Sequence, residues 1–185
     1  MNEAGDLRKN ISLKNLTLVN FVHLTENEME MVRRWRNSDS VRRWMYQDHL
    51  ISTEEHRAFL QSLTSNDKSF SWLAKESDGT SLGIISLNNV DFRNRHAYLG
   101  IYTNPATTQG HAGTALLESL KEIAFRVAHL HTLKLEVLQQ NDRAINFYKK
   151  AGFVEEGVLK EFIFRDNHWC DVIIMGLTEP SRKTS

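Results

Sequence analysis

The chain has 185 residues, of which 41% are hydrophobic and 25% are charged, and this length suits one domain that buries its core without disulfides or a structural metal. Its 23 basic and 23 acidic side chains cancel, so we expect no nucleic-acid partner, because a phosphate backbone is usually met by clustered positive charge. No hydrophobic run is long enough to span a bilayer, so we expect no membrane anchoring.

Both ends of the chain are polar and mixed in charge. We expect loose tails at residues 1–12 and 178–185 around a single domain at 13–177. No hydrophobic signal segment opens the sequence, and Cys170 is the single cysteine, which excludes an internal disulfide and fits a reducing compartment. The sequence therefore predicts a cytoplasmic protein in which Cys170 is a core thiol of the last strand, at 169–175.

The N-terminal third predicts a strand followed by two helices. Apolar residues at short spacing between positions 13 and 25 indicate a strand and a turn. Thr25 and Glu28 have the spacing of a capping box, which predicts a helix from residue 26 to about 37, and Ser52 or Thr53 can cap a second helix.

The segment that joins these helices is rich in basic and aromatic residues. It holds Arg33, Arg34, Arg36, Arg42, Arg43, Trp44, Met45 and Tyr46. Such a surface could bind a ligand, or several of its arginines could belong to a solvated helix face, and spacing alone leaves both readings open.

Three strands and a long helix are predicted next. Alternating patterns at 70–75, 81–90 and 95–103, with a turn at Asp78-Gly79, indicate an antiparallel meander. A helix from about Thr114 to His129 follows, and the small residues before it, from Gly110 to Gly113, let the backbone N–H groups of its first turn approach a phosphate closely. The same glycines would also suit an ordinary turn.

The stretch 141–153 carries many signals of a short amphipathic helix. Asn141 is a good N-cap, charges of the favourable sign lie at each end, and Gly152 suits the left-handed position that ends a helix. The alternating segment 133–138 before it predicts a strand, and Phe153 opens another.

This order of elements, with Asn-x-x-Ala-x-x-Phe-Tyr and Lys-x-Gly-Phe at 141–153, resembles the GCN5-related N-acetyltransferase (GNAT) family over residues 13–177. The resemblance implies an α+β fold in α/β/α layers, with a mixed, mostly antiparallel sheet of about seven strands flanked by about four helices. It also implies acetyl-CoA as co-substrate and no metal.

In this family the pantetheine arm of the cofactor pairs with the fourth strand, and its pyrophosphate meets the following loop and helix. The resemblance therefore assigns cofactor binding to Ile101, Tyr102, Thr103, Gly110, His111, Ala112, Gly113, Thr114, Asn141 and Phe147. The loop departs from the family pattern Gln/Arg-x-x-Gly-x-Gly/Ala, because the fourth and sixth positions counted from Gln109 are Ala112 and Thr114.

The resemblance also assigns the chemistry. Tyr148 would protonate the departing thiolate of coenzyme A, since an unperturbed tyrosine with a pKa of about 10 is protonated at neutral pH. Glu136 would remove protons from the attacking amine, directly or through water. The alternatives are that Tyr148 is a core aromatic and that Glu136 is a solvent-facing strand residue.

A narrower resemblance lies in the segments 35–37, 44–46, 96–105 and 135–137. They look like the bacterial enzymes that N-acetylate UDP-4-amino-4,6-dideoxy-N-acetyl-β-L-altrosamine in pseudaminic acid biosynthesis, a pathway that serves flagellin glycosylation. This implies a nucleotide-sugar substrate bound by Arg36, Trp44, Met45, Tyr46 and Tyr98. A ribosomal-protein N-terminal acetyltransferase and a non-catalytic acyl-CoA-binding module are the alternatives, and the sequence leaves a homodimer open.

Overall fold

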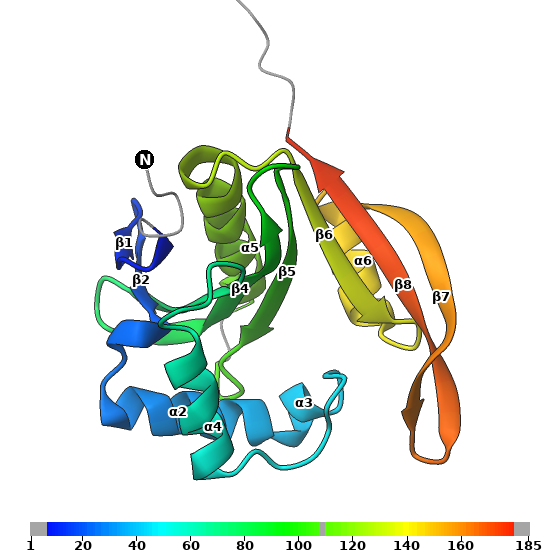
Figure 1. Ribbon diagram of the computed structural model, residues 1–185, viewed down its shortest axis with the longest axis horizontal. Coiled ribbons are helices and arrows are strands. Elements are labelled where there is room, and N and C mark those ends of the chain that lie inside the picture. Colours follow the sequence, from blue (N-terminus) through cyan, green and yellow to red (C-terminus); the bar gives the residue numbers. More distant parts are fainter. Residues whose placement is uncertain (1–6, 108–109, 180–185) are drawn as a thin grey trace, which may run out of the picture.

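The computed structural model describes residues 7–107 and 110–179, and within them one eight-stranded sheet organises the molecule (Figure 1). Its order is β1-β2-β3-β4-β5-β6-β8-β7. The strands are β1 (Ile11–Ser12), β2 (Leu16–Asn20), β3 (Phe70–Glu76), β4 (Ser81–Asp91), β5 (His96–Thr103), β6 (Thr132–Leu138), β7 (Val154–Arg165) and β8 (His168–Thr178). Neighbours pair antiparallel except β5 and β6, which are parallel.

The helices of the described residues are α2 (Glu26–Asn37), α3 (Asp39–Arg42), α4 (Thr53–Ser62), α5 (Ala112–Glu122) and α6 (Asp142–Lys150), with a short 3₁₀ turn η1 (Phe21–His23) and a π-helical turn η2 (Ile123–Val127). The capping box of Thr25 and Glu28 is confirmed, and Ser52 forms a second one with Glu55. The one-turn helix α3 was not expected, because the sequence predicted no helix between the end of the first one at about residue 37 and the cap at Ser52 or Thr53.

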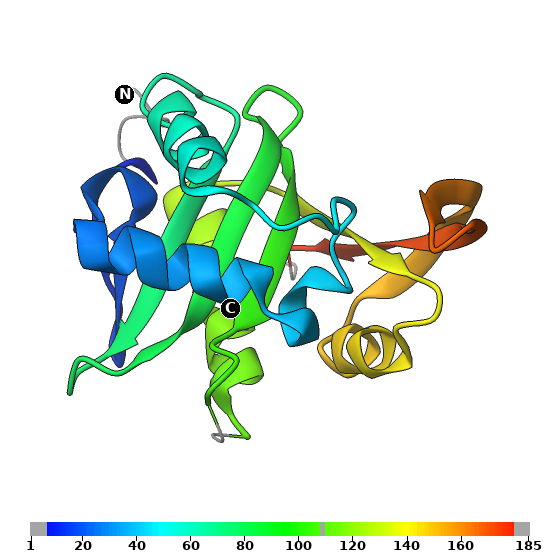
Figure 2. The same cartoon turned by 90° about the horizontal axis from the view of Figure 1, so that it is seen from below.

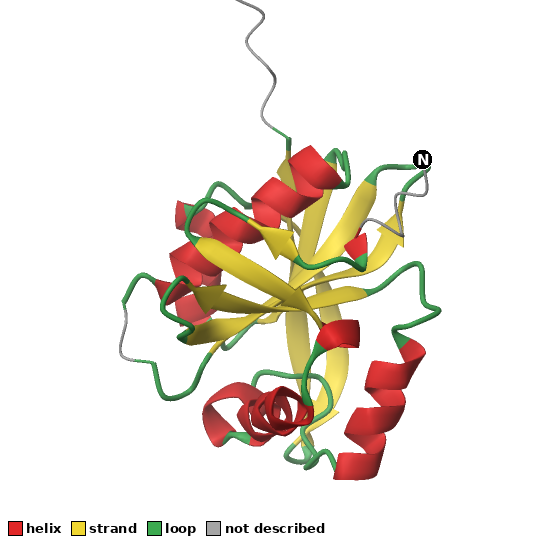
Figure 3. Ribbon diagram, turned by 90° about the vertical axis from the view of Figure 1, so that its left-hand side faces the viewer, coloured by secondary structure: helices red, strands yellow, loops and turns green. Residues whose placement is uncertain are grey.

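The helices cover the two faces of the sheet in separate groups. Val32 of α2 and Leu60 of α4 pack against Leu73 and Ile84 on one face. Leucines of α5 and Ile145 of α6 pack on the other face, in the larger cluster, and Figure 2 shows α4 above the sheet and α5 and α6 below it. Figure 3 shows the twist of the sheet between these layers. The fold is therefore the mixed α+β arrangement that was expected, with β1 as an additional strand.

Residues 7–12, which were expected to belong to a loose tail, pack against the domain. Leu7 is fully buried, its carbonyl oxygen accepts a hydrogen bond from Asn20, and β1 pairs with β2. Residues 1–6 and 180–185 lie outside the described part of the chain. Within that part, no helix has the length and the apolar character that crossing a membrane requires.

The sheet forks between β5 and β6. Their pairing runs only from His96–Tyr98 to Thr132–Lys134, and Figure 1 shows the two strands diverging beyond it. β5 continues to pair with β4 as far as Thr103, and β6 continues to pair with β8 as far as Leu138. One edge of each strand is therefore left without a strand partner beyond the branch point.

The β7–β8 hairpin bends at a bulge. The register shifts between Leu159 and Ile163, and Glu161 has a φ of 48°. Asp171 holds the bulge, since its carboxylate accepts from the Glu161 N–H and from the Lys160 ammonium group. Cys170, on β8, is buried and free, which confirms it as a core thiol.

Candidate functional site

The backbone of β5 offers hydrogen-bonding groups to the fork. Opposite residues of an antiparallel pair alternate between bonded and unbonded pairs, and the Asn104 N–H donates to the Leu82 carbonyl oxygen at 2.7 Å. Thr103 and Ile101 therefore direct their N–H and C=O groups away from β4, into the fork. Their free N–H and C=O groups could pair with an extended cofactor arm, which the family resemblance predicted to lie along this strand.

Tyr102 differs from its two neighbours. Its backbone groups face β4 by the same alternation, and its side chain packs on the other face of the sheet, in the cluster of α2 and α4. Burial raises the pKa of its phenol. The structure thus places the Tyr102 side chain in the lining of the pocket described below.

The first turn of α5 lies beside α6. The helix begins at Ala112, two residues earlier than expected, so the N–H groups of Ala112, Gly113 and Thr114 are the ones without an intrahelical partner. His111 is the N-cap and makes no side-chain capping bond. A Cβ built on Gly113 would lie 3.6 Å from the Phe147 ring, so the predicted phosphate loop and the predicted cofactor helix meet at Gly113. Gln109 lies outside the described residues.

Asn141 and Tyr148 lie at the two ends of α6. The Asn141 side chain accepts from the Ala144 N–H at 3.2 Å, which confirms it as the N-cap and leaves its amide N–H groups for another partner. The Tyr148 ring packs edge-on between Phe147 and Phe153, at centroid distances of 5.2 and 5.5 Å. Burial raises the pKa of the Tyr148 phenol, so the group stays protonated at neutral pH and above.

Glu136 lies on the face of the sheet opposite Tyr148. Leu135 and Val137 are buried in the cluster that Tyr148 packs against, and because side chains alternate along a strand, Glu136 projects to the other side. It is exposed, and its carboxylate accepts a 2.5 Å hydrogen bond from the Tyr46 hydroxyl. The two candidate catalytic groups therefore approach the fork from opposite faces.

Most of the arginines near the helix connection are engaged by the protein itself. Arg33 and Arg34 both bind Glu30 and lower the pKa of its carboxyl to about 2. Arg42 binds Asp39 at 2.6 Å, and Arg43 lies 5.4 Å from the Trp44 ring centroid. For these residues the solvated or structural reading holds.

Arg36 is different. Its Nη2 donates to the carbonyl oxygen of Gln47 at 2.8 Å, while its Nη1 is buried and finds no hydrogen-bond partner within the described residues. Burial lowers the pKa of the guanidinium, and the neighbouring charges of Arg165 and Arg42 lower it further. A buried donor left without a partner is costly, so an incoming acceptor atom would be favoured here.

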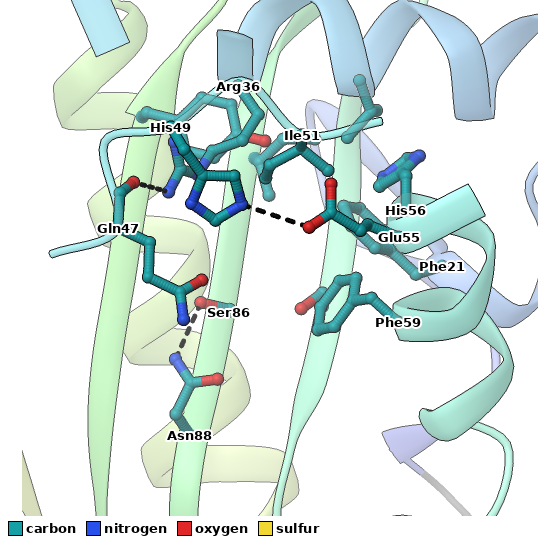
Figure 4. Close-up of a pocket in the computed structure, with 14 residues that line it drawn as sticks. Phe21, Arg36, Gln47, His49, Ile51, Glu55, His56, Phe59, Ser86 and Asn88 are labelled. Atoms are coloured by element: carbon teal, nitrogen blue, oxygen red, sulfur yellow. Dashed lines mark hydrogen bonds and ion pairs between the residues drawn. The ribbon is translucent and has the colours of Figure 1, made fainter. Parts of the chain in front are cut away.

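Arg36 lines a pocket of about 410 Å³ between the α2–α4 layer and strands β3, β4 and β5 (Figure 4). The lining residues are Phe21, Val32, Arg36, Gln47, His49, Ile51, Glu55, His56, Phe59, Ser71, Ile84, Ser86, Asn88 and Tyr102. Sequence analysis found Arg36 among them. Trp44, Met45, Tyr46 and Tyr98 are not part of this lining. Glu136 and Tyr98 both lie near Tyr46, since both raise the pKa of its phenol.

Tyr102 was also named, for the cofactor; the other pocket residues were missed because they come from five separate elements and the loop before α4. Gln47 and His49 precede α4, and Ser86 and Asn88 are spaced two apart on β4 so that both face the pocket. Figure 4 shows the Gln47 side chain pointing toward them. The period-two spacing of polar residues in β4 was the available signal, but it is equally typical of a solvated strand face.

The pocket holds little free negative charge. Glu55, its one lining carboxylate, caps α4 and lies 3.3 Å from the His49 ring. His56 is buried, and burial together with the charge of Arg33 lowers the pKa of its imidazole. Within the described residues no three His, Cys, Asp or Glu side chains gather as a metal-ligand set.

Comparison with known proteins places this geometry in context. The profile of the family described as "Acetyltransferase (GNAT) domain" matches residues 21–174. The curated acetyltransferase PseH of Campylobacter jejuni is 27% identical over 149 residues, which cover 80% of this chain and 91% of that protein.

Two solved structures share the fold. The spermidine N-acetyltransferase of Vibrio cholerae, in complex with CoA and spermine, superposes with a TM-score of 0.80 at 22% identity, covering 88% of this chain and 95% of that one. The N-acetyltransferase PseH of Campylobacter jejuni superposes with a TM-score of 0.68 at 21% identity, covering 89% and 99%.

Proposed function

Because the chain belongs to the GNAT acetyltransferase family, we propose that its acceptor is the 4-amino group of a UDP-linked amino-deoxy sugar, UDP-4-amino-4,6-dideoxy-N-acetyl-β-L-altrosamine, in pseudaminic acid biosynthesis. The protein is an acetyl-CoA-dependent N-acetyltransferase. The similarity to PseH supports the sugar, and the spermidine enzyme supplies the main rival, a polyamine.

The observation that carries the proposal is the unpartnered Arg36 guanidinium nitrogen on the wall of the pocket. A guanidinium pairs well with phosphate or with neutral carbonyl acceptors, and repels a cation. Spermidine carries several positive charges, and Glu55 is already occupied by the N-terminus of α4 and by His49. The pocket therefore favours a neutral or anionic acceptor over a polyamine.

The size and walls of the pocket fit the same class of acceptor. A volume of about 410 Å³ lies in the range of small-molecule sites, which are mostly apolar with a few placed polar groups. Phe21 and Phe59 give aromatic surface for a sugar or a base, and Ser86 and Asn88 give hydrogen-bonding groups.

We assign the steps of direct transfer as follows. Ile101 and Thr103 would hold the cofactor arm in the fork, and the first turn of α5 would hold its phosphates. Glu136 accepts a proton from the amine as the amine attacks the thioester carbonyl, and Tyr148 gives its proton to the departing thiolate. General acid or base help of this type is typically worth about 10²- to 10⁴-fold.

The test is a comparison of acceptors. The enzyme is incubated with acetyl-CoA and, separately, with the UDP-linked 4-amino sugar, spermidine, and a peptide that starts with alanine. We expect the sugar to give the highest kcat/KM. Spermidine or peptide turnover without sugar turnover would refute the proposed acceptor, and binding of acetyl-CoA without turnover of any amine would favour a non-catalytic role.

A further inference from the structure

Glu136 is held by a single described side chain, that of Tyr46. The hydroxyl donates to Oε2 of the carboxylate at 2.5 Å, a length typical of a hydrogen bond to a charged oxygen. Lys134, the next residue on the same face of β6, pairs with Glu156 instead. The carboxylate thus keeps most of its lone pairs, and its orientation depends on where Tyr46 lies.

Tyr46 does not belong to a helix or a strand. It lies in the α3–α4 loop, residues 43–52, whose carbonyl oxygens accept hydrogen bonds from arginines of the surrounding elements. Arg36 of α2 binds Gln47 and Arg42 of α3 binds Asp48. The loop is therefore a defined structure whose shape depends on guanidinium groups rather than on its own ladder of hydrogen bonds.

Arg165 makes the contacts that flank Tyr46 directly. It is the last residue of β7, its side chain is 9% exposed, and it donates to the carbonyl oxygens of Arg43 and Met45 on the N-terminal side of Tyr46. Its Nε lies 3.3 Å from the Asp48 carboxylate on the other side. Phe162, three residues earlier on β7, packs edge-on against the Tyr46 ring with centroids 6.1 Å apart.

We propose that Tyr46 and Arg165 are positioning residues for the Glu136 carboxylate, so that the tip of the β7–β8 hairpin sets the geometry of amine deprotonation. Arg165 fixes the loop backbone, the loop presents the Tyr46 hydroxyl, and the hydroxyl orients the carboxylate toward the fork. Neither residue needs to touch the reacting atoms. The inference rests on the proposed role of Glu136 as base.

A double-mutant experiment separates positioning from general loss of structure. Tyr46→Phe and Arg165→Lys are each made in the wild-type and in the Glu136→Gln background, and kcat/KM is measured at saturating acetyl-CoA. The amine is the UDP-linked 4-amino sugar, or spermidine if that is the amine turned over. In the wild-type background each change should lower kcat/KM about tenfold, the worth of one hydrogen bond to a charged group.

In the Glu136→Gln background neither change should cause a further fall, because both act through the carboxylate that has been removed. An equal fall in both backgrounds would mean that the residues only support the fold, and would overturn the proposal. A Glu136→Gln enzyme with the wild-type rate across pH would instead refute the base assignment itself, which is a different outcome.

The split between kcat and KM gives a second readout. Positioning of the carboxylate affects the deprotonation of the amine and not the cofactor site, so Tyr46→Phe and Arg165→Lys should lower kcat and leave the KM of acetyl-CoA unchanged. A rise in the KM of acetyl-CoA would count against positioning. Arg34→Lys is the matched control for Arg165→Lys, since Arg34 is exposed and binds Glu30, and it should leave both kcat and this KM unchanged.

Discussion

The Nη2 of Arg36 donates to the carbonyl oxygen of Gln47 at 2.8 Å, and both side chains line the same pocket. One guanidinium therefore shapes the pocket wall, and its second terminal nitrogen is buried without a hydrogen-bond partner among the described residues. Lysine at this position keeps the charge but loses the forked geometry. We expect Arg36→Lys to raise the KM of the acceptor about tenfold or more and to leave the KM of acetyl-CoA unchanged.

Steady-state kinetics with each substrate varied in turn checks this prediction. Arg34→Lys is the control, because it makes the same substitution two residues away on α2, at an exposed position outside the pocket lining. A rise in both KM values would indicate that the loop had moved rather than that a ligand contact was lost.

Tyr148→Phe should separate chemistry from packing. The ring stays between Phe147 and Phe153, so the unfolding temperature and acetyl-CoA affinity should be retained, while kcat should fall about 10²-fold because the proton donor is gone. Burial raises the pKa of this phenol, so its ionisation should not produce a basic limb near pH 10. Calorimetry and the pH dependence of kcat test these statements. If Tyr148→Phe kept the wild-type rate, the thiolate would have to be protonated by solvent rather than by Tyr148.

Glu136→Gln should show a deficit that depends on pH. The amide keeps the shape and part of the hydrogen bonding of the carboxylate but cannot accept a proton from the amine. As pH rises, more of the free amine forms without help, so the deficit relative to wild type should shrink. Rates measured from about pH 6 to pH 9 with one acceptor test this prediction. A deficit that stays constant over this range would contradict the role of Glu136 as the base.

His56 should make the stability of the fold pH-dependent. Burial and Arg33 lower the pKa of its imidazole in the folded protein, whereas the unfolded chain has the ordinary value of about 6.5. The unfolded state therefore binds more protons below that value, so this contribution to stability is full above about pH 6.5 and is lost as pH falls. Thermal unfolding at several pH values should show that the unfolding temperature falls with pH. In His56→Gln the unfolding temperature should depend less on pH. An unchanged pH dependence in the variant would assign the effect to other groups.

Much of the fold followed from local signals in the sequence. The capping boxes at Thr25 and Ser52 begin α2 and α4 as expected, and Asn141 and Gly152 bound α6. These signals are readable because a cap and its partner lie three residues apart. β1 and α3 escaped prediction because each is too short for a periodicity to develop.

The site was less predictable because its geometry depends on contacts between distant segments. The Tyr46–Glu136 bond joins residues 90 apart, and Arg165 reaches back 120 residues to Met45. The resemblance placed Tyr46 with the substrate but gave no sign of this bond. The pocket residues Gln47, Ser86 and Asn88 carry no spacing that distinguishes them from ordinary surface positions.

The fork between β5 and β6 has a consequence for solvent exchange along β5. The amide protons of Ile101 and Thr103 point into the fork, while those of Gly100 and Tyr102 point to β4, so protection from hydrogen–deuterium exchange should alternate from one residue to the next in the free protein. Acetyl-CoA that lies along this edge would supply the missing acceptors. The alternation should then disappear at saturation, and the residues where it persists would show how far along the strand the cofactor reaches.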